Sequence, residues 1–364
     1  MCLSPIRIRN PNLNKYSRNN KILKQVSDCE SQFINVPCNH CSVCIALRQN
    51  YFCQRVQMES LDNVIYFFTF TYKPDYLPSL VVKGRQIDCH DIKDLQNLFK
   101  RVRKNYDLPK FRYVITSEFG SRLHRPHYHG LLFFPYSSFT CVNGIPNFSD
   151  LLGFERKLND ILLSEWCINL GSNRSPDYKP LCDFHKNGRF RNFDCQLVDT
   201  FHNTEHNVSF YVSKYMCKYD KYVDSIRLWL WHNCDSEEEY YTFWNRFKPK
   251  FLYSKNFGNP ESDKVKTKIR EDIDISISAK LPYPCFFDSF TGKSFPLSPY
   301  YRKRYMDYLD SLIFSSYSDS LSDFSRVIEF DKDIDDSIKL AKQFDDNMSF
   351  LNSNTNDLDY LIYG

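Results

Sequence analysis

A run of β-branched and aromatic residues extends from Val64 to Tyr72 and is followed by Pro74. Because both faces of this run are apolar, the pattern predicts a central β-strand. Residues 111–118 and 127–134 predict two further strands. Gly120 and Pro126 lie in the short segment between them, which favours an antiparallel hairpin.

Amphipathic periodicity predicts the helices. Residues 91–105 carry apolar side chains at spacings of three and four. Similar patterns predict further helices and one strand, over residues 43–61, 150–166, 208–223 and 226–247 and over residues 192–200. This order predicts an α+β fold with a central antiparallel sheet flanked by helices. A cysteine-rich helical segment precedes this core, and a mostly helical or irregular C-terminal region follows it.

Shifts in composition divide the chain into four expected segments, which are residues 1–60, 61–225, 226–304 and 305–364. Residues 1–30 are polar and are expected to be loosely ordered. The last segment is acidic and rich in Asp and Ser, and we expect it to be partly disordered. Residues 140–190 are interpreted as an irregular insertion without an assigned role.

Composition and charge narrow the class of protein. Hydrophobic residues make up 42% of the 364 residues and charged residues 25%, which excludes an intrinsically disordered chain. No apolar run has the about 18 residues of a membrane span, and no secretory signal core is visible, so we expect no membrane partner and a cytoplasmic location. The 14 cysteines are then reduced thiols or metal ligands.

The net charge of +4 is unevenly distributed. Residues 1–130 hold 20 Lys and Arg against 10 Asp and Glu, whereas residues 305–364 hold 4 against 13. A basic front with an acidic tail is typical of a polyanion-binding body. The candidate DNA-binding cations, which a solvated helix face would equally explain, are Lys100, Arg101, Arg103, Lys104, Arg122 and Arg125.

His127 and His129 are two residues apart on a predicted strand, so their side chains project from the same face. Gly130 is expected to leave room beside them. A hairpin would bring Glu118, nine positions before His127, next to the imidazole pair. Two histidines and one carboxylate suit Mg²⁺ or Mn²⁺ acting on a phosphate. The alternatives are solvated histidines and a surface carboxylate paired with a nearby arginine.

A third pattern lies in the helix predicted over residues 208–223. At about 100° per residue, Tyr211, Tyr215 and Lys218 share one narrow stripe, with Lys214 at its edge. These tyrosines would present phenol oxygens to a metal site, as nucleophiles assisted by the lysines. The alternative is that both tyrosines are half-buried packing residues.

Together these motifs resemble the rolling-circle replication initiators of the HUH endonuclease superfamily, and most closely those of the single-stranded-DNA microviruses of bacteria. The matching segments are residues 67–72, Glu118 with residues 125–130, and residues 211–218. A cysteine-rich stretch at residues 37–44 is also similar. The resemblance covers about residues 37–220 and implies an HUH nicking-joining domain over residues 61–225.

The resemblance implies Glu118, His127 and His129 as metal ligands and Tyr211 and Tyr215 as nucleophiles, with Lys214 and Lys218 in support. It implies that the protein nicks a specific single-stranded or nicked viral origin, holds the 5′ end as a phosphotyrosine, leaves a 3′-hydroxyl primer and rejoins the displaced strand. A host helicase and a host DNA polymerase are the implied partners, in the cytoplasm of an infected bacterium. The alternatives are an HUH transposase or plasmid relaxase, and a non-catalytic metal-containing DNA-binding module.

Cys38, Cys41 and Cys44 are separated by two residues each, and zinc binding would add His40 or Cys53 as a fourth ligand. Structural zinc sites ordinarily use two separated pairs, and this spacing lacks the second pair. Ordinary reduced thiols at the start of a helix are therefore the favoured interpretation, with structural Zn²⁺ as the alternative.

Overall fold

The computed structural model describes residues 3–9, 33–38, 41–120, 122–142, 144–172, 174–182, 193–198, 220–281, 283–288, 292–305 and 308. The chain forms two compact units, residues 51–306 and a second unit of residues 1–50 with residues 307–364. The segment boundaries expected at residues 60, 225 and 304 stay predictions. Across the described ranges, no helix combines the length and apolar character needed to cross a membrane.

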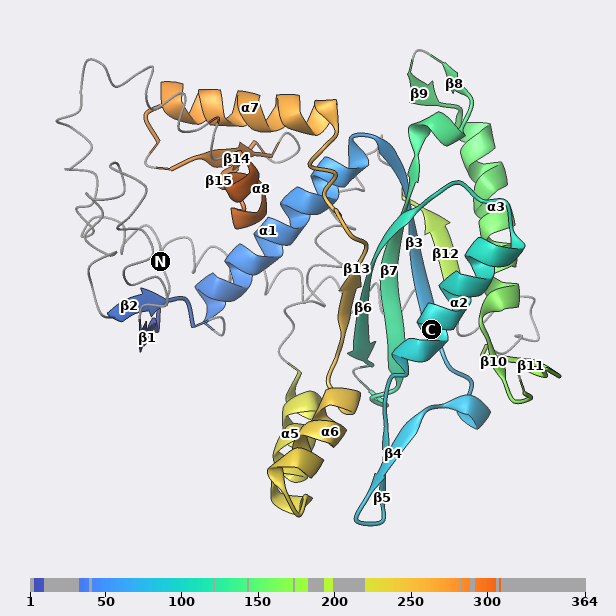
Figure 1. Ribbon diagram of the computed structural model, residues 1–364. Coiled ribbons are helices and arrows are strands. Elements are labelled where there is room, and N and C mark those ends of the chain that lie inside the picture. The colour runs from blue at the N-terminus through green and yellow to red at the C-terminus, as the bar shows by residue number, and fades with distance from the viewer. Residues whose placement is uncertain are drawn as a thin grey trace. The chain divides into compact units, whose positions relative to one another are not determined.

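The larger unit contains a five-stranded sheet in the order β12-β3-β7-β6-β13, with every neighbouring pair antiparallel. This arrangement, with helices on its faces, confirms the predicted α+β class (Figure 1). Each of the three predicted central strands is confirmed to within two residues. The strands of the sheet are β3 (Asn63–Thr71), β6 (Arg112–Phe119), β7 (Pro126–Pro135), β12 (Phe193–Leu197) and β13 (Phe251–Tyr253).

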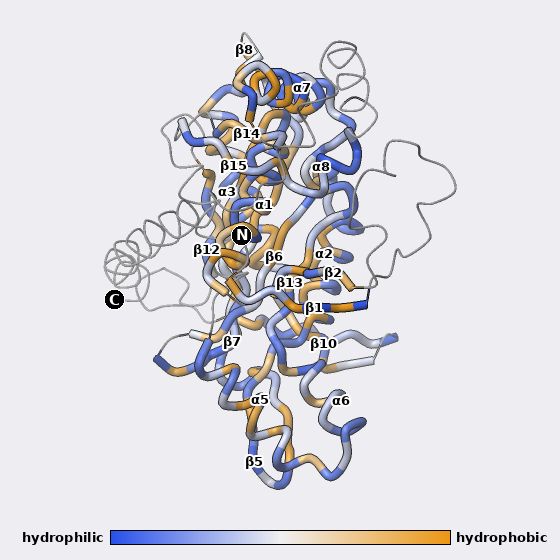
Figure 2. Tube along the Cα trace, turned by 90° about the vertical axis from the view of Figure 1, so that its left-hand side faces the viewer, coloured by the Kyte–Doolittle hydropathy of each residue, from blue (hydrophilic) through white to orange (hydrophobic). Residues whose placement is uncertain are grey.

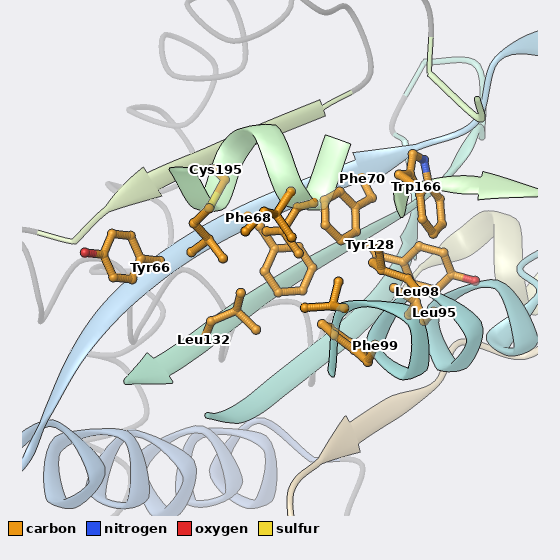
Figure 3. Packing of buried hydrophobic residues seen from close by; sticks show 14 of the residues in the cluster. Tyr66, Phe68, Phe70, Leu95, Leu98, Phe99, Tyr128, Leu132, Trp166 and Cys195 are labelled. Carbon is orange, nitrogen blue, oxygen red and sulfur yellow. The ribbon is translucent and has the colours of Figure 1, made fainter. Parts of the chain in front are cut away.

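One face of the sheet is covered by α2 (Ile92–Asn105) and α3 (Phe148–Glu165). The apolar side of α2 packs against aromatic side chains of β3 and β7, among them Phe70 and Tyr128 (Figure 3). Asp91 caps α2 by accepting a hydrogen bond from the backbone N–H of Lys93 at 2.9 Å. The main core of the protein therefore lies on this face.

The opposite face of the sheet packs against the C-terminal half of α1 (Ser42–Ser60). Phe52 and Val56 of this helix meet strand residues that include Leu131 and Phe133. Because side chains alternate along a strand, His127 and His129 project from this same face, beyond the apolar cluster.

A smaller apolar cluster joins two hairpins beside the end of β6. It unites β4 (Ser79–Val82) and β5 (Arg85–Asp88) with α5 (Lys221–Asn233) and α6 (Glu237–Phe247). The predicted helix over 226–247 is wrong as one element, because residues 234–236 separate α5 from α6. The predicted helix over 208–223 is also wrong at its end. Asp220 has extended backbone angles and caps α5, accepting from the N–H of Tyr222 at 2.9 Å.

The remaining elements are short or lie outside the sheet. The polar N-terminal segment, expected to be loosely ordered, contains a strand that pairs with residues 33–36. Colouring by hydropathy alternates along α7, as suits a helix with one buried side (Figure 2). These elements are β1 (Ile6–Arg9), β2 (Phe33–Val36), β8 (Cys141–Val142), β9 (Ile145–Pro146), β10 (Cys167–Asn169), β11 (Tyr178–Pro180), α7 (Asp263–Ser278), β14 (Cys285–Phe287), β15 (Ser294–Pro296), α8 (Pro299–Arg304) and the 3-10 turns Pro74–Tyr76 and Tyr136–Ser138.

Candidate metal centre

The structure brings Glu118, His127 and His129 together on two adjacent strands. Glu118 of β6 is directly opposite His127 of β7, and His129 is one row further along the same face. Their potential ligand atoms all lie within 4.8 Å of one another. Glu118 Oε1 contacts Nε2 of His127 and lies 3.0 Å from Nε2 of His129. The antiparallel register therefore forms the cluster, whereas its role in holding a metal stays a prediction.

The cluster is nearly enclosed, because the Glu118 side chain is 11% exposed and the two imidazoles less. This burial contradicts the alternative of a surface carboxylate. Burial opposes the charge on Glu118, but its contacts with His127 and His129 outweigh that effect, so its pKa lies well below the usual range. The second carboxylate oxygen, Oε2, is buried without a hydrogen-bond partner among the described residues. A buried, unsatisfied carboxylate oxygen is a ready ligand for a cation.

The outer nitrogens of the two imidazoles are held in place. Nδ1 of His127 donates to the carbonyl of Arg125 at 2.9 Å, because a carbonyl can only accept. Nδ1 of His129 lies 2.8 Å from the hydroxyl of Thr69, and the ring stacks on Phe67. Both Nε2 atoms are thus directed at Glu118. This donor set, two imidazole nitrogens and a carboxylate with their outer atoms hydrogen-bonded, fits a divalent cation.

His90 is a residue of this site that the sequence pattern did not single out. It lies in the connection between β5 and α2 and is 3% exposed. Its Nε2 donates to the carbonyls of Glu118, at 2.8 Å, and His127, at 3.2 Å. Burial lowers the pKa of His90 to about 3, so the ring is neutral at physiological pH. His90 therefore ties together the backbones of two candidate ligands, and no local motif marks such a contact.

The expected role of Gly130 is wrong. Gly130 faces away from the two histidines, because neighbouring residues of a strand alternate between its faces. A Cβ atom there would lie 2.3 Å from Cζ of Phe68 and 2.8 Å from the carbonyl oxygen of Val114. The glycine thus makes room for an aromatic ring of the main core.

The candidate DNA-binding cations occupy two regions. Arg122 is exposed in the loop between β6 and β7, next to the metal centre, and Arg125 in the same loop donates to the carbonyl of Tyr72. The others belong to α2, which packs on the opposite face of the sheet. Among them Arg101 is largely buried and pairs with Glu165, with Nε 2.8 Å from Oε2. The remaining three, Lys100, Arg103 and Lys104, are exposed.

Tyr211, Lys214, Tyr215 and Lys218 lie outside the described residues, so their expected roles stay predictions. The chain that follows them is well placed. Tyr222, in the first turn of α5, stacks on His124 with ring centroids 4.0 Å apart, and its ring lies 5.3 Å from that of Phe119. Both partners border the loop between β6 and β7. The chain resumes next to the metal centre immediately after the tyrosine motif.

The second group of potential metal ligands is in the smaller unit. The sulfurs of Cys38, Cys41 and Cys44 lie within 4.8 Å of one another. Burial opposes ionisation of Cys41, but N–H groups of Cys44 and Leu3 donate to its sulfur and lower its pKa to about 6. The structure therefore gathers the three predicted thiols around one point.

A comparison with protein-family models identifies residues 65–220 as similar to the replication-associated protein ORF2 family. The matched part contains Glu118, His127 and His129 and extends to Asp220, just before α5. No curated protein and no solved structure matches the chain. The family match supports a replication-associated protein that binds DNA and acts when replication begins.

Proposed function

We propose that this protein starts rolling-circle DNA replication by nicking and rejoining single-stranded DNA at an origin. The observation that carries the proposal is the buried cluster of Glu118, His127 and His129 on paired strands, inside the region that matches the replication-associated family. An HUH-type endonuclease needs such a cluster, because cleavage of a phosphodiester requires a polarised phosphate. The resemblance to microvirus initiators supports a viral origin as the substrate and a host bacterium as the setting.

The residues of the cluster would hold Mg²⁺ or Mn²⁺ through Nε2 of His127, Nε2 of His129 and a carboxylate oxygen of Glu118. The cation, once bound, would polarise the scissile phosphate and stabilise the charge that develops on it. Thr69, the Arg125 carbonyl and His90 would keep the ligands oriented. Arg122, exposed beside the cluster, would contact the DNA backbone.

Tyr211 or Tyr215 would supply the nucleophile. The phenol loses its proton, its oxygen forms a bond to phosphorus, and the bond from phosphorus to the 3′ oxygen breaks. The released oxygen takes up a proton and becomes a 3′-hydroxyl primer, while the 5′ phosphate stays on the tyrosine. The contact of Tyr222 with His124 supports this assignment, because it holds the end of the tyrosine motif near the cluster.

Two tyrosines would serve repeated cycles. One holds the old 5′ end while the other cuts the regenerated origin, and the 3′-hydroxyl then attacks the first phosphotyrosine to close a circle. Lys214 and Lys218 would stabilise the phenolate or the phosphate. A host helicase to unwind the duplex and a host polymerase to extend the primer are the partners that this cycle requires.

The test uses a 5′-labelled and a 3′-labelled origin strand, incubated with the full chain and Mn²⁺ and analysed on a denaturing gel. We expect a protein band shifted by covalently attached DNA that carries the 3′ label, together with a free 5′-labelled product. Glu118→Gln should abolish both products. Retention of uncut DNA without a covalent adduct would instead indicate a non-catalytic binding module, and cleavage that persists in EDTA would contradict the metal assignment.

A further inference from the structure

We propose that Cys38, Cys41 and Cys44 bind a structural Zn²⁺ that holds the N-terminal strand pair on the first turn of α1. All three thiols lie within 4.8 Å of one another, and two of them are buried. A zinc ion with sulfur ligands at about 2.3 Å needs sulfurs about 3.8 Å apart in tetrahedral geometry. Each pair therefore has to close by at most about 1 Å for coordination.

Hydrogen bonds to sulfur prepare the site for a cation. The N–H of Cys41 donates to the sulfur of Cys38 at 3.3 Å, and the N–H groups of Cys44 and Leu3 donate to the sulfur of Cys41. Two successive turns thus place an N–H on the sulfur three residues earlier. Such donors stabilise thiolates, the form of cysteine that binds metal.

The start of α1 adds to this effect. The carbonyl of Cys41 accepts the first helical hydrogen bond, from the N–H of Ile45 at 3.0 Å, so Cys41 is the N-cap of α1. Thiolates at this end of a 19-residue helix lie at its positive pole. A cluster of thiolates held by these donors still needs a countercharge, and a divalent cation supplies it.

The surrounding structure explains why a metal would be needed. β1 and β2 are four residues each and pair only with one another among the described strands. Ile6 and Phe33, at opposite ends of this ladder, are 49% and 41% exposed. An isolated two-stranded ladder with exposed apolar residues is at best marginally stable. Cys38 follows β2 by two residues, so a metal would anchor this ladder to α1.

Geometry excludes one of the expected fourth ligands. Cys53 follows Cys44 by nine residues within α1, which is about 13.5 Å along the helix axis. It is also buried in the larger unit. Cys53 is therefore a matched control, since it is a buried cysteine of the same helix outside the cluster. Zinc bound by three thiolates keeps a fourth position for water or another donor.

The experiment measures zinc in the purified full chain by plasma emission spectroscopy. A His127→Ala/His129→Ala background removes the other candidate metal site. We expect one zinc per chain, about a tenfold loss of zinc in Cys41→Ser, and unchanged zinc in Cys53→Ser. Equal zinc in the two cysteine variants, or no zinc in the parent, would overturn the proposal, and in the second case thiol titration would identify a disulfide as the alternative.

Cobalt substitution keeps the proposal testable if Cys41→Ser fails to fold. Co²⁺ bound by three thiolates gives an intense near-ultraviolet band from sulfur-to-metal charge transfer, which a histidine and carboxylate site does not give. We expect this band in the His127→Ala/His129→Ala protein and in its Cys53→Ser derivative. A cobalt complex of these proteins without the band would rule out thiolate coordination.

Discussion

His90 donates a hydrogen bond from its buried ring to the backbone carbonyl of Glu118, at 2.8 Å. The same N–H reaches the carbonyl of His127 at 3.2 Å, so one side chain from the connection before α2 joins the two strands under the metal centre. His90 also packs edge-on against Phe119 and Tyr128, with ring centroids 4.7 and 5.2 Å away. The position of the candidate ligands thus depends on a residue outside the hairpin that carries them.

Replacing His90 by Phe keeps an aromatic ring but removes the donor. Two buried carbonyls then lose a partner, and we expect the free energy of unfolding to fall by about 1–3 kcal/mol. We also expect Mn²⁺ affinity to fall about tenfold, because the ligand backbones are no longer held. Urea unfolding and calorimetric titration measure the two effects. His90→Gln, which retains an N–H donor, should recover part of both, and an equal loss in Gln and Phe variants would contradict this role.

Thr69→Val tests the contact with Nδ1 of His129. Valine has nearly the same shape but cannot hydrogen-bond to the imidazole, so we expect Mn²⁺ affinity to fall by about 10- to 100-fold. Thr71→Val is the matched control. Thr71 is 7% exposed, like Thr69, and lies opposite His127, but its hydroxyl is directed to the carbonyl of Tyr72 at 3.4 Å. Equal losses in the two variants, measured by calorimetry, would show that the effect is not specific to His129.

The tyrosine pair has a distinct kinetic signature. Tyr211→Phe and Tyr215→Phe should each retain single cleavage of an origin strand but fail in repeated cycles, because one nucleophile cannot hold an end and cut again. The double variant should form no covalent adduct, since phenylalanine has no phenol oxygen. Quantifying adduct and circular product on denaturing gels checks this. An adduct in the double variant would mean that the nucleophile lies elsewhere.

The two basic regions should differ in their effect on DNA binding. Arg122 is exposed next to the metal centre, whereas Lys100 and Lys104 lie on a helix that covers the opposite face of the sheet. Affinity for single strands should fall steeply with salt. We expect Arg122→Gln to reduce the slope of log affinity against log salt by about one, and Lys100→Gln/Lys104→Gln to leave it unchanged. Fluorescence anisotropy over a salt series measures the slopes, and the reverse order would move the DNA path to α2.

Asp94 makes stability depend on pH. Burial, together with the nearby charge of Asp91, raises the pKa of Asp94 to about 6, and its carboxylate accepts a hydrogen bond from the Tyr72 hydroxyl at 3.0 Å. The folded state therefore keeps the proton to a higher pH than the unfolded chain. The free energy of unfolding then decreases as pH rises from about 4 to about 6, and the loss remains above that range.

Asp94→Asn removes this dependence and retains an acceptor for Tyr72. At pH 7.5 we expect the variant to be more stable than the parent by about 1–3 kcal/mol, and at pH 4 about equal. Denaturant unfolding at the two pH values measures the difference. Asp107→Asn, at an exposed position after α2, is the control. A gain that is the same at both pH values would assign the effect to packing.

The strands of the hairpin and the approach of Glu118 to His127 could be predicted because they depend on local patterns. Alternation along 111–118 and 127–134 sets the faces, and a short turn sets the pairing. β13 could not be predicted, since it has three residues and pairs with β6 across about 130 residues of chain. His90 acts through the backbone of other residues, so its sequence context carries no motif. The reason for Gly130 lies in Phe68, on another strand.

The stacking of Tyr222 on His124 has a consequence for the joining reaction. Tyr215 precedes Tyr222 by seven residues, so the chain between them spans at most about 25 Å. A 5′ end bound to Tyr215 would remain on this short leash, next to the site where a 3′-hydroxyl arrives. Short tethers give effective concentrations in the millimolar range. Circle closure would then proceed as an intramolecular step whose rate is independent of the concentration of free DNA ends.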